Sequence, residues 1–506
     1  MGASMSDEGL SSSNSLDEST GLTLPSMSPR SLLSHFGPGI VLMMTGIGTS
    51  HLITAPTAGG RFEYALLWCI PASYIFKYYG FEMAFRFTNA TGKSLLDAYG
   101  TAKFKWPVWY MLIVTIIECA LGQAGRLVAA AAVMYYLFTE SMALPINPDL
   151  ATYGLILGVI SVAILLRGNY SIVEKFAKVL AGLLLLSTLT VYFKAPAPLS
   201  EMGHFFLVET PSGSWLIIAG FLGLLPTGMD VSLQASEWGS ARRLGMARIR
   251  PELERAGLAP TFDPFGSPKE DLSVDASRIP SHMQEYCRRW FRISLWDFRF
   301  GHVASFIVAT IFLLLAAVWI YPNPVEGRAV MGEIAGIFTR SVGPWMMIVF
   351  MIGAFAATFS TSFNYFDGWP RLVAACCRNL FPATANLKGI EKHHHTSEDC
   401  SKKWYSEYNI YRITMIYSLI AAVIFIALIP RPVYMVLIAS ALAFFVAPII
   451  FYLNLYYCLT VIPKTDKIFY PRPFERYFAW FSLAVFSGMI VILFFARVLN
   501  IPLFGV

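Results

Sequence analysis

The stretch TGIGTSHLITAP, Thr45 to Pro56, decides the fold of this chain. It lies inside an apolar run, Gly37 to Gly60, that is long enough to cross a bilayer. Its middle holds a glycine followed by three polar residues: Gly48, Thr49, Ser50 and His51. Backbone groups that leave a helix in lipid must be satisfied by protein, water or ligand. We therefore predict an unwound segment here that binds a substrate.

A second apolar run, Trp215 to Trp238, is interrupted in the same way. Its centre combines helix breakers with short polar residues: Leu225, Pro226, Thr227, Gly228, Met229 and Asp230. Two broken helices in corresponding positions of two halves are typical of a transporter binding site. Pro226 and Gly228 are interpreted as backbone devices that break the helix and supply no ligand atoms.

The composition is that of a polytopic membrane protein. Of the 506 residues, 56% are hydrophobic and 14% are charged, and the mean hydropathy is +0.56. A soluble chain carries about 25% charged residues. The sequence has no phosphate loop, nucleotide motif or nucleophile constellation, so an ATP-driven pump or a membrane enzyme is not expected. The net charge of +6 requires no nucleic-acid partner, and no cofactor is expected.

Apolar runs of about 20 residues predict eleven membrane spans. They lie near 37–60, 64–87, 107–138, 152–167, 172–194, 215–238, 299–321, 343–366, 411–430, 433–459 and 476–500. The interrupted spans are the first and the sixth, which predicts two inverted repeats of five helices. Residues 1–33 are predicted to be a disordered cytosolic tail. Residues 34–506 are predicted to form one transporter domain. It consists of a first repeat (37–194), a second repeat (215–459) that contains a cytosolic loop (239–297), and an extra helix (476–500).

The distribution of lysine and arginine predicts the orientation, because cytoplasmic loops carry the excess of both. With the N-terminus inside, the inside segments hold 30 of the 38 basic residues and the outside segments hold 6. Lys77 and Arg126 are the remaining two, and both lie within spans. We therefore expect a cytoplasmic N-terminus, an outside C-terminus and residence in the plasma (inner) membrane. A second inside loop carries His393 to His395, which a solvated loop explains better than a metal site.

The run GPGIVLMMTGIGTSHLITAPTAGGRFEYALLW resembles the first span and following loop of the Nramp divalent-metal transporters. The match is best in its tail, AGGR followed by an aromatic residue and YALLW. The loop TNATGKSLLDAYG and the Ala- and Ser-rich eighth span are also similar, and the resemblance covers roughly Phe36 to Tyr457. It implies a LeuT-like, all-α fold and import of divalent metals, usually with protons.

The chain departs from this family at its metal ligands. Where the family carries Asp-Pro-Gly-Asn in its first span, this chain has Gly48 to His51. The family's Met-Pro-His in the sixth span corresponds either to Leu225 to Thr227 or to Gly228 to Asp230, depending on where the alignment is anchored. Some related proteins with altered sites carry magnesium, and one plant relative serves in signalling.

His51 and Asp230 are the residues at the two breaks that can carry chemistry. A neutral imidazole binds a transition metal, and a protonatable one carries a proton. A carboxylate in a membrane core is costly, so it points to function. We predict that the two meet near mid-membrane as tentative metal ligands. The alternatives are a histidine that only bonds to a neighbouring helix and an aspartate in a structural ion pair.

Four further charged residues lie in the second and third spans: Lys77, Glu82, Glu118 and Arg126. Lys77 and Glu82 are five residues apart and do not face each other, so each needs another partner. Glu118 and Arg126 are two turns apart and can line one polar path. The family's third span carries acids used in proton movement, and Glu118 resembles them. A network that merely fixes helix packing is the equal alternative.

These features predict a secondary-active transporter that moves a divalent metal cation across the bilayer by alternating access, with protons as a possible second substrate. The missing ligands favour a hard ion such as magnesium over a soft one such as iron. Because the His51 imidazole can bind a transition metal, a transition-metal substrate is an alternative. A small organic solute at the same break is the alternative within transport. A signalling membrane protein without transport is the alternative from another class. The oligomeric state is left open.

Overall fold

The structure is a computed structural model. It describes residues 24–26, 28, 47–142, 148–167, 170–241, 246, 249, 279–323, 330–381, 384 and 404–495, with the backbone alone in 170–181. Several predicted features fall outside these residues: nearly all of the tail 1–33, the start of the first span, most of the loop 239–297, the histidine triplet and the end of the last helix.

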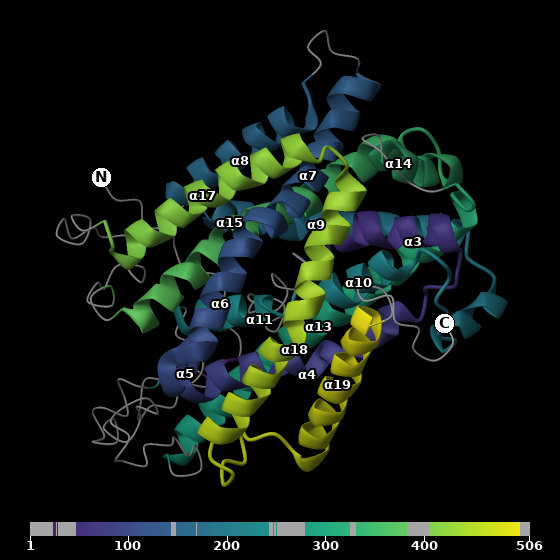
Figure 1. Cartoon of the computed structure of the whole chain (residues 1–506). Coiled ribbons are helices and arrows are strands. Elements are labelled where there is room, and N and C mark those ends of the chain that lie inside the picture. The colour runs from purple at the N-terminus through teal and green to yellow at the C-terminus, as the bar shows by residue number, and fades with distance from the viewer. Residues whose placement is uncertain are drawn as a thin grey trace.

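The described residues form helices and turns, and no strand occurs among them. Figure 1 shows the helices packed into one bundle. Their bounds are α3 (Ala55–Phe62), α4 (Cys69–Thr91), α5 (Leu95–Tyr99), α6 (Trp106–Ile117), α7 (Gln123–Met134), α8 (Leu150–Leu166), α9 (Tyr170–Lys194), α10 (Trp215–Leu224), α11 (Val231–Ala241), α13 (Ser281–Trp319), α14 (Val330–Ser341), α15 (Met346–Leu380), α17 (Glu407–Leu428), α18 (Pro432–Val461) and α19 (Pro473–Leu493).

Six stretches of helix among the described residues are long and apolar enough to cross a membrane. They are Lys103–Ser141, Ser281–Trp319, Met346–Leu380, Glu407–Leu428, Pro432–Val461 and Pro473–Leu493. Three shorter apolar helices, Leu150–Leu166, Gly182–Lys194 and Trp215–Leu224, cover further predicted spans. The protein is therefore an integral, multi-pass membrane protein, and the count of eleven spans stays a prediction.

The structure differs from the prediction at one boundary and in one additional helix. The helix α13 begins at Ser281, so the end of the predicted loop 239–297 is helical. Its first turns are too polar for a hydropathy window, but they bury Met283 and Cys287, which are four residues apart and share a face. A further helix, α14, lies between the seventh and eighth predicted spans and was not predicted.

The second predicted break is confirmed. Helix α10 ends at Leu224, and Leu225 has an extended backbone (φ −92°, ψ 136°). The chain remains non-helical to Asp230, and α11 begins at the next residue. The peptide bond before Pro226 is cis. The helix breakers that the sequence places here therefore separate two half-helices.

The first predicted break has a different local form. Ile47 and Gly48 form a turn, and the helix begins at Thr49, whose φ and ψ are −64° and −44°. Ser50 to Thr54 form a π-helical turn that continues into α3. Within the described part of this span, Ser50 and His51 are thus wound in a π-helical turn rather than in extended chain. Such turns inside helices are frequent at functional sites.

Helix α4 lies at the centre of the arrangement that positions both breaks. It packs against α10, α11, α13, α18 and α19 (Figure 1). Its polar side chains Ser73, Tyr74 and Lys77 are buried, although the helix is 23 residues long and lies in an apolar bundle. Buried polar groups must find partners within the protein. Each of these three side chains has a partner in one of the two interrupted spans, and Tyr74 has a second partner in α13.

Candidate functional site

His51 lies in a closed cluster of hydrogen bonds at the first break. Its Nε2 atom is 3.0 Å from the Tyr74 hydroxyl and 2.8 Å from the Ser305 hydroxyl, and Nδ1 is 3.1 Å from the Ser50 hydroxyl. The hydroxyls of Tyr74 and Ser305 are 2.6 Å apart. His51 is fully buried. Both ring nitrogens are therefore engaged by α4, α13 and the histidine's own turn, which favours the hydrogen-bonded alternative over a ligand role.

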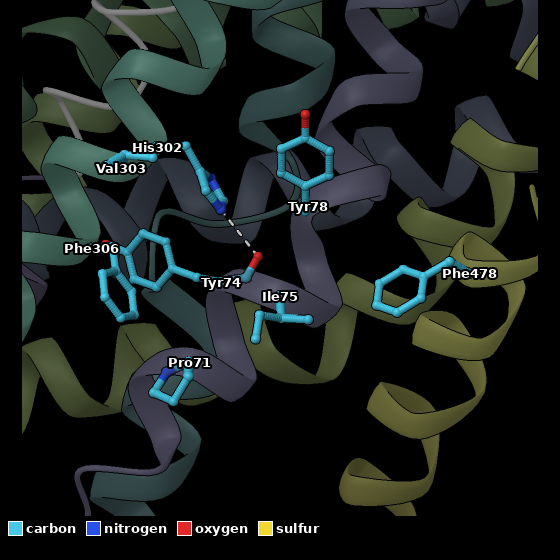
Figure 2. A pocket seen from close by; sticks show the side chains of 8 residues that line it. All are labelled: Pro71, Tyr74, Ile75, Tyr78, His302, Val303, Phe306 and Phe478. Carbon is cyan, nitrogen blue, oxygen red and sulfur yellow. Dashed lines mark hydrogen bonds between the residues drawn. The ribbon is translucent and has the colours of Figure 1, made fainter. Parts of the chain in front are cut away.

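A second histidine, His302, contacts the backbone of the same tyrosine. His302 Nε2 donates to the Tyr74 carbonyl oxygen at 3.1 Å, because that oxygen can only accept. Figure 2 shows this bond at the edge of an apolar cavity of about 370 Å³. The cavity lies between α4, α13 and α19 and is lined by Pro71, Tyr74, Ile75, Tyr78, His302, Val303, Phe306 and Phe478. Tyr74 therefore links the His51 cluster to this cavity.

Gly48 brings the first span against α15. A Cβ atom built on Gly48 would collide with the side chain of Thr361. Thr49 and Ser50, the next two predicted binding residues, are also buried, with 3% and 2% of their surface exposed. The start of this helix is thus enclosed by protein, and a larger residue at position 48 would separate it from the eighth predicted span.

Lys77 holds the second break. Its ammonium group donates to four carbonyl oxygens, those of Leu222 (3.1 Å), Gly223 (2.8 Å), Leu225 (2.7 Å) and Thr227 (2.8 Å). Four residues earlier on α4, the Ser73 hydroxyl donates to the Leu225 carbonyl at 2.7 Å and lies 3.1 Å from the Phe221 carbonyl. One face of α4 therefore bonds to carbonyl groups in the last turn of α10 and in the break that follows it.

Asp230, at the far end of this break, is held by α15. Its Oδ2 atom accepts from Trp369 Nε1 at 2.7 Å and from Gln234 Nε2 at 3.3 Å. Thr227 is bound to the same helix, because its hydroxyl lies 2.8 Å from the hydroxyl of Tyr365. Pro226 and Gly228, on either side of Thr227, are also buried.

Arg126 and Glu118 approach the same two aromatic rings. The Arg126 guanidinium carbon lies 3.7 Å from the centre of the Tyr365 ring and 4.5 Å from that of Trp369. A guanidinium this close to an aromatic face gains cation–π stabilisation. Glu118 Oε2 is 4.0 Å from Arg126 Nη1. Glu118 and Arg126 thus lie together beside the aromatic rings that contact Thr227 and Asp230, and their role as a polar path stays a prediction.

Glu82 belongs to a different cluster. It forms an ion pair with Arg86 at 2.5 Å and lies 3.9 Å from Arg299. Arg86 also pairs with Glu475 of α19 at 3.1 Å. The prediction that Lys77 and Glu82 do not face each other is confirmed, and Glu82 is a part of the contact with α19 and α13.

The hydrogen bonds of His51 and Asp230 point to different elements. His51 contacts α4 and α13, whereas Asp230 contacts α11 and α15. In these bonds the two residues share no partner, and their meeting at one ligand stays a prediction. Within the part of the chain that the structure describes, no group of three or more His, Cys, Asp and Glu side chains could hold a metal ion.

Four side chains of this site were not predicted: Tyr74, Ser305, Tyr365 and Trp369. Aromatic and serine residues are common in membrane spans, so none of the four stands out alone. A weak signal was present in α4, where Ser73, Tyr74 and Lys77 place three polar groups within about one turn.

Comparison with known proteins supplies the family. A model of the family described as Natural resistance-associated macrophage protein-like, or Nramp, matches residues 39–496. The chain belongs to the Nramp family. The resemblance of the sequence around Ala58 to Trp68 is thereby confirmed, and the match extends past the end of α19.

Solved structures support the fold of this Nramp-family protein. Two mutants of the manganese transporter of Eremococcus coleocola superpose with a TM-score of 0.62 each. The glutamate-to-glutamine mutant is 13% identical, and the match covers 96% of this chain and 92% of that one. The histidine-to-alanine mutant is 14% identical and covers 95% and 91%. The predicted all-α, LeuT-like fold is confirmed.

A curated relative is more similar in sequence but covers less of the chain. An uncharacterized protein of Pasteurella multocida (strain Pm70) is 22% identical over 344 residues. The match covers 66% of this chain and 68% of that protein.

Proposed function

We propose that this Nramp-family protein is a secondary-active transporter of a divalent metal cation. The observation that carries the proposal is Asp230, a buried acid that stands at the end of the helix break between α10 and α11. A carboxylate in a membrane core is by default a functional group. Its place at a break in an Nramp-family chain supports a cation as the substrate, in keeping with the manganese transporter that shares the fold.

The substrate site that we propose lies between the two breaks. Asp230 supplies the charge, and Thr227 and Gly228 supply the neighbouring chain. The first span contributes the segment Gly48 to His51. Lys77 already occupies carbonyl oxygens from Leu222 to Thr227. The cation would therefore rely on carboxylate and hydroxyl oxygens and on retained water, which suits a hard ion such as magnesium better than a soft one.

Proton coupling is the finer part of this proposal, and Glu118 is the residue we assign to it. Its Oε2 atom accepts no hydrogen bond from the described residues, although the side chain is 2% exposed. Arg126 lies 4.0 Å away, and its guanidinium packs on the Trp369 ring, whose Nε1 donates to Asp230. A positioned carboxyl group can give and accept a proton, which is the chemistry that proton coupling requires.

A small organic solute is the second candidate, and the charge balance favours it. At this site two buried acids, Asp230 and Glu118, are accompanied by two buried cations, Lys77 and Arg126. The two negative and two positive charges cancel, so no net charge remains to attract a divalent ion. A zwitterionic or uncharged solute with hydrogen-bonding groups would suit such a site.

Uptake into proteoliposomes distinguishes these candidates. The purified protein is tested with magnesium, manganese, iron and zinc, and the internal pH is followed during uptake. Saturable uptake of at least one of these metals is the expected result, and internal acidification would support proton coupling. Binding of amino acids without any metal uptake would favour the organic solute. A folded protein that transports neither would favour the signalling alternative.

A further inference from the structure

The coordination of Lys77 is that of a bound cation rather than of an ion pair. Its ammonium group contacts four carbonyl oxygens at 2.7–3.1 Å and is fully buried. The ion pairs among the described residues include none between Lys77 and a carboxylate. Four peptide dipoles therefore surround the ammonium group, in the way that carbonyl oxygens replace water around an ion in a selectivity filter.

The number of acceptors suits an ammonium group better than a neutral amine. An ammonium group has three N–H donors, which can serve four close acceptors when one is shared, whereas a neutral amine has two. Two of the acceptors, Leu222 and Gly223, are near the C-terminal end of α10, where the helix dipole is negative. A positive charge is stabilised at that place whether or not it is attached to the chain.

The distances define the size of the ion that fits. Magnesium binds oxygen at about 2.0–2.1 Å and calcium at about 2.3–2.6 Å. Charge-assisted N–H to O bonds are about 2.7–2.9 Å long, which matches three of the four contacts of Lys77. The four carbonyl oxygens are thus spaced for a monovalent cation of ammonium size. They lie too far from the centre of the site to bind the proposed divalent substrate.

We propose that the break in the sixth span is a monovalent-cation site that the chain fills with its own ammonium group. Lys77 holds α10 and the break in their observed arrangement without any co-bound ion. Removal of the side chain beyond Cβ would open a site for a small alkylammonium ion, ammonium or potassium. A consequence for transport rests on the proposed function. The native protein transports its substrate without sodium or potassium, whereas the variant that lacks the Lys77 side chain depends on a monovalent cation.

The test uses two variants of the full chain that differ only in whether they leave space. Lys77→Ala removes the charge and the stem, whereas Lys77→Met removes the charge but keeps the stem. The melting temperature of each purified protein is measured in choline chloride and after exchange to ammonium, potassium, methylammonium or propylammonium chloride. We expect Lys77→Ala to melt lower than wild type in choline and to gain about 2–4 °C, in a saturable manner, from the alkylammonium ions. Wild type and Lys77→Met should gain none.

The control Ser73→Ala removes a neighbouring hydroxyl from the same face of α4 and should create no cation dependence. Equal shifts in wild type and Lys77→Ala would overturn the proposal, as would a Lys77→Ala protein that folds but responds to no cation. If Lys77→Ala does not fold in choline, recovery of folded protein only when propylammonium is present during expression and purification supports the site, and failure to recover it overturns the site.

The melting temperatures do not depend on transport, so they distinguish this inference from the proposed function. If wild type transports no metal yet Lys77→Ala gains stability from alkylammonium, the proposed function fails and the cation site stands. If wild type transports a metal only when sodium or potassium is present, the site is not filled by Lys77 in the working protein, and the inference fails.

Discussion

Tyr74 and Lys77 lie three residues apart on α4, and each holds one of the two interrupted spans. The Tyr74 hydroxyl is 3.0 Å from His51 Nε2, and the Lys77 ammonium donates to the Thr227 carbonyl at 2.8 Å. Residues three apart on a helix are neighbours on its surface. One turn of α4 therefore links the two breaks, and a shift of this helix would disturb both.

Replacing Asp230 by asparagine should abolish transport and leave the protein folded. Asparagine has the size of aspartate, and its carbonyl oxygen can still accept from Trp369 Nε1, which is 2.7 Å from the native carboxylate. The charge that we assign to the substrate is lost. We expect at least a tenfold fall in the initial rate of metal uptake, measured in proteoliposomes. Glu333→Ala, which removes an exposed acid from α14, is the matched control and should transport normally.

The His51 cluster should behave as one hydrogen-bonded unit. Tyr74→Phe leaves a buried nitrogen of His51 with fewer partners, and His51→Ala leaves the Tyr74 hydroxyl with Ser305 alone at 2.6 Å. Each change should cost about 1–3 kcal/mol of unfolding free energy. The double variant should cost less than the sum of the two, and a double-mutant cycle on thermal or chemical unfolding measures the difference. Strict additivity would mean that the two side chains are not coupled.

Gly122 should not tolerate alanine, because a Cβ atom there would meet Glu118, Arg126 and the Trp369 ring, the last at 2.6 Å. Overpacking of a buried helix contact costs about 1–3 kcal/mol. Gly488→Ala in α19 is the control, since nothing lies within 4 Å of its Cβ position. That change should be neutral or should stabilise the helix by about 0.5–1 kcal/mol. Melting temperatures of the two variants in the same detergent provide the comparison.

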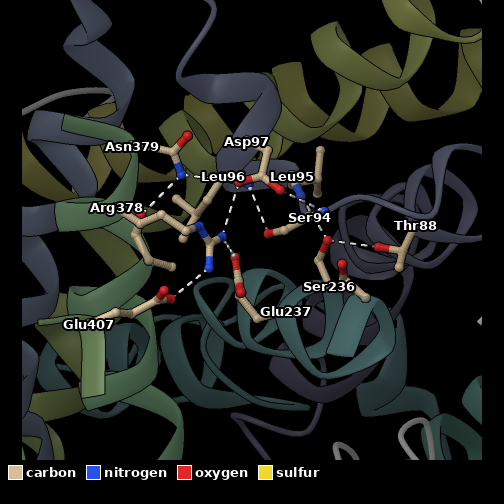
Figure 3. A network of polar contacts seen from close by, with 12 residues as sticks. Thr88, Ser94, Leu95, Leu96, Asp97, Ser236, Glu237, Arg378, Asn379 and Glu407 are labelled. Atoms are coloured by element: carbon tan, nitrogen blue, oxygen red, sulfur yellow. Dashed lines mark hydrogen bonds and ion pairs between the residues drawn. The ribbon is translucent and has the colours of Figure 1, made fainter. Parts of the chain in front are cut away.

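Arg378 joins three helices at one end of the bundle (Figure 3). It pairs with Asp97 at 3.0 Å, Glu237 at 3.2 Å and Glu407 at 2.8 Å. Arg378→Gln would leave three acids around an uncharged amide, and we expect a loss of about 3–5 kcal/mol in stability. Arg412→Ala removes an exposed arginine of α17 and should have little effect. If the two variants unfold at the same temperature, the network contributes nothing to stability.

We propose the orientation that the basic residues predict, and cysteine labelling tests it. Ser267→Cys lies in the loop predicted to be cytosolic, and Phe206→Cys lies between α9 and α10, where Phe206 is 88% exposed. A membrane-impermeant thiol reagent applied to intact cells should label Phe206→Cys and spare Ser267→Cys. Permeabilised cells should label both. The reverse pattern on intact cells would invert the proposed topology and place the N-terminus outside.

The sequence alone determined the class of the protein and the position of its second break. Composition identifies a membrane protein because a chain with so few charged residues cannot cover a soluble surface. Pro226 and Gly228 interrupt the sixth span because they are incompatible with a regular helix. These are local properties of the chain, and local properties can be read from order and composition.

The tertiary structure decided which partners the polar side chains have. The sequence shows that Lys77 needs a partner, but the four carbonyl groups that bind it are 145–150 positions further along the chain. Backbone carbonyls have no sequence signature, so their availability depends on where α10 ends and on how α4 packs against it. His51 likewise meets Ser305 across 254 positions. Such contacts arise because helices distant in sequence pack together in space, and no local pattern encodes them.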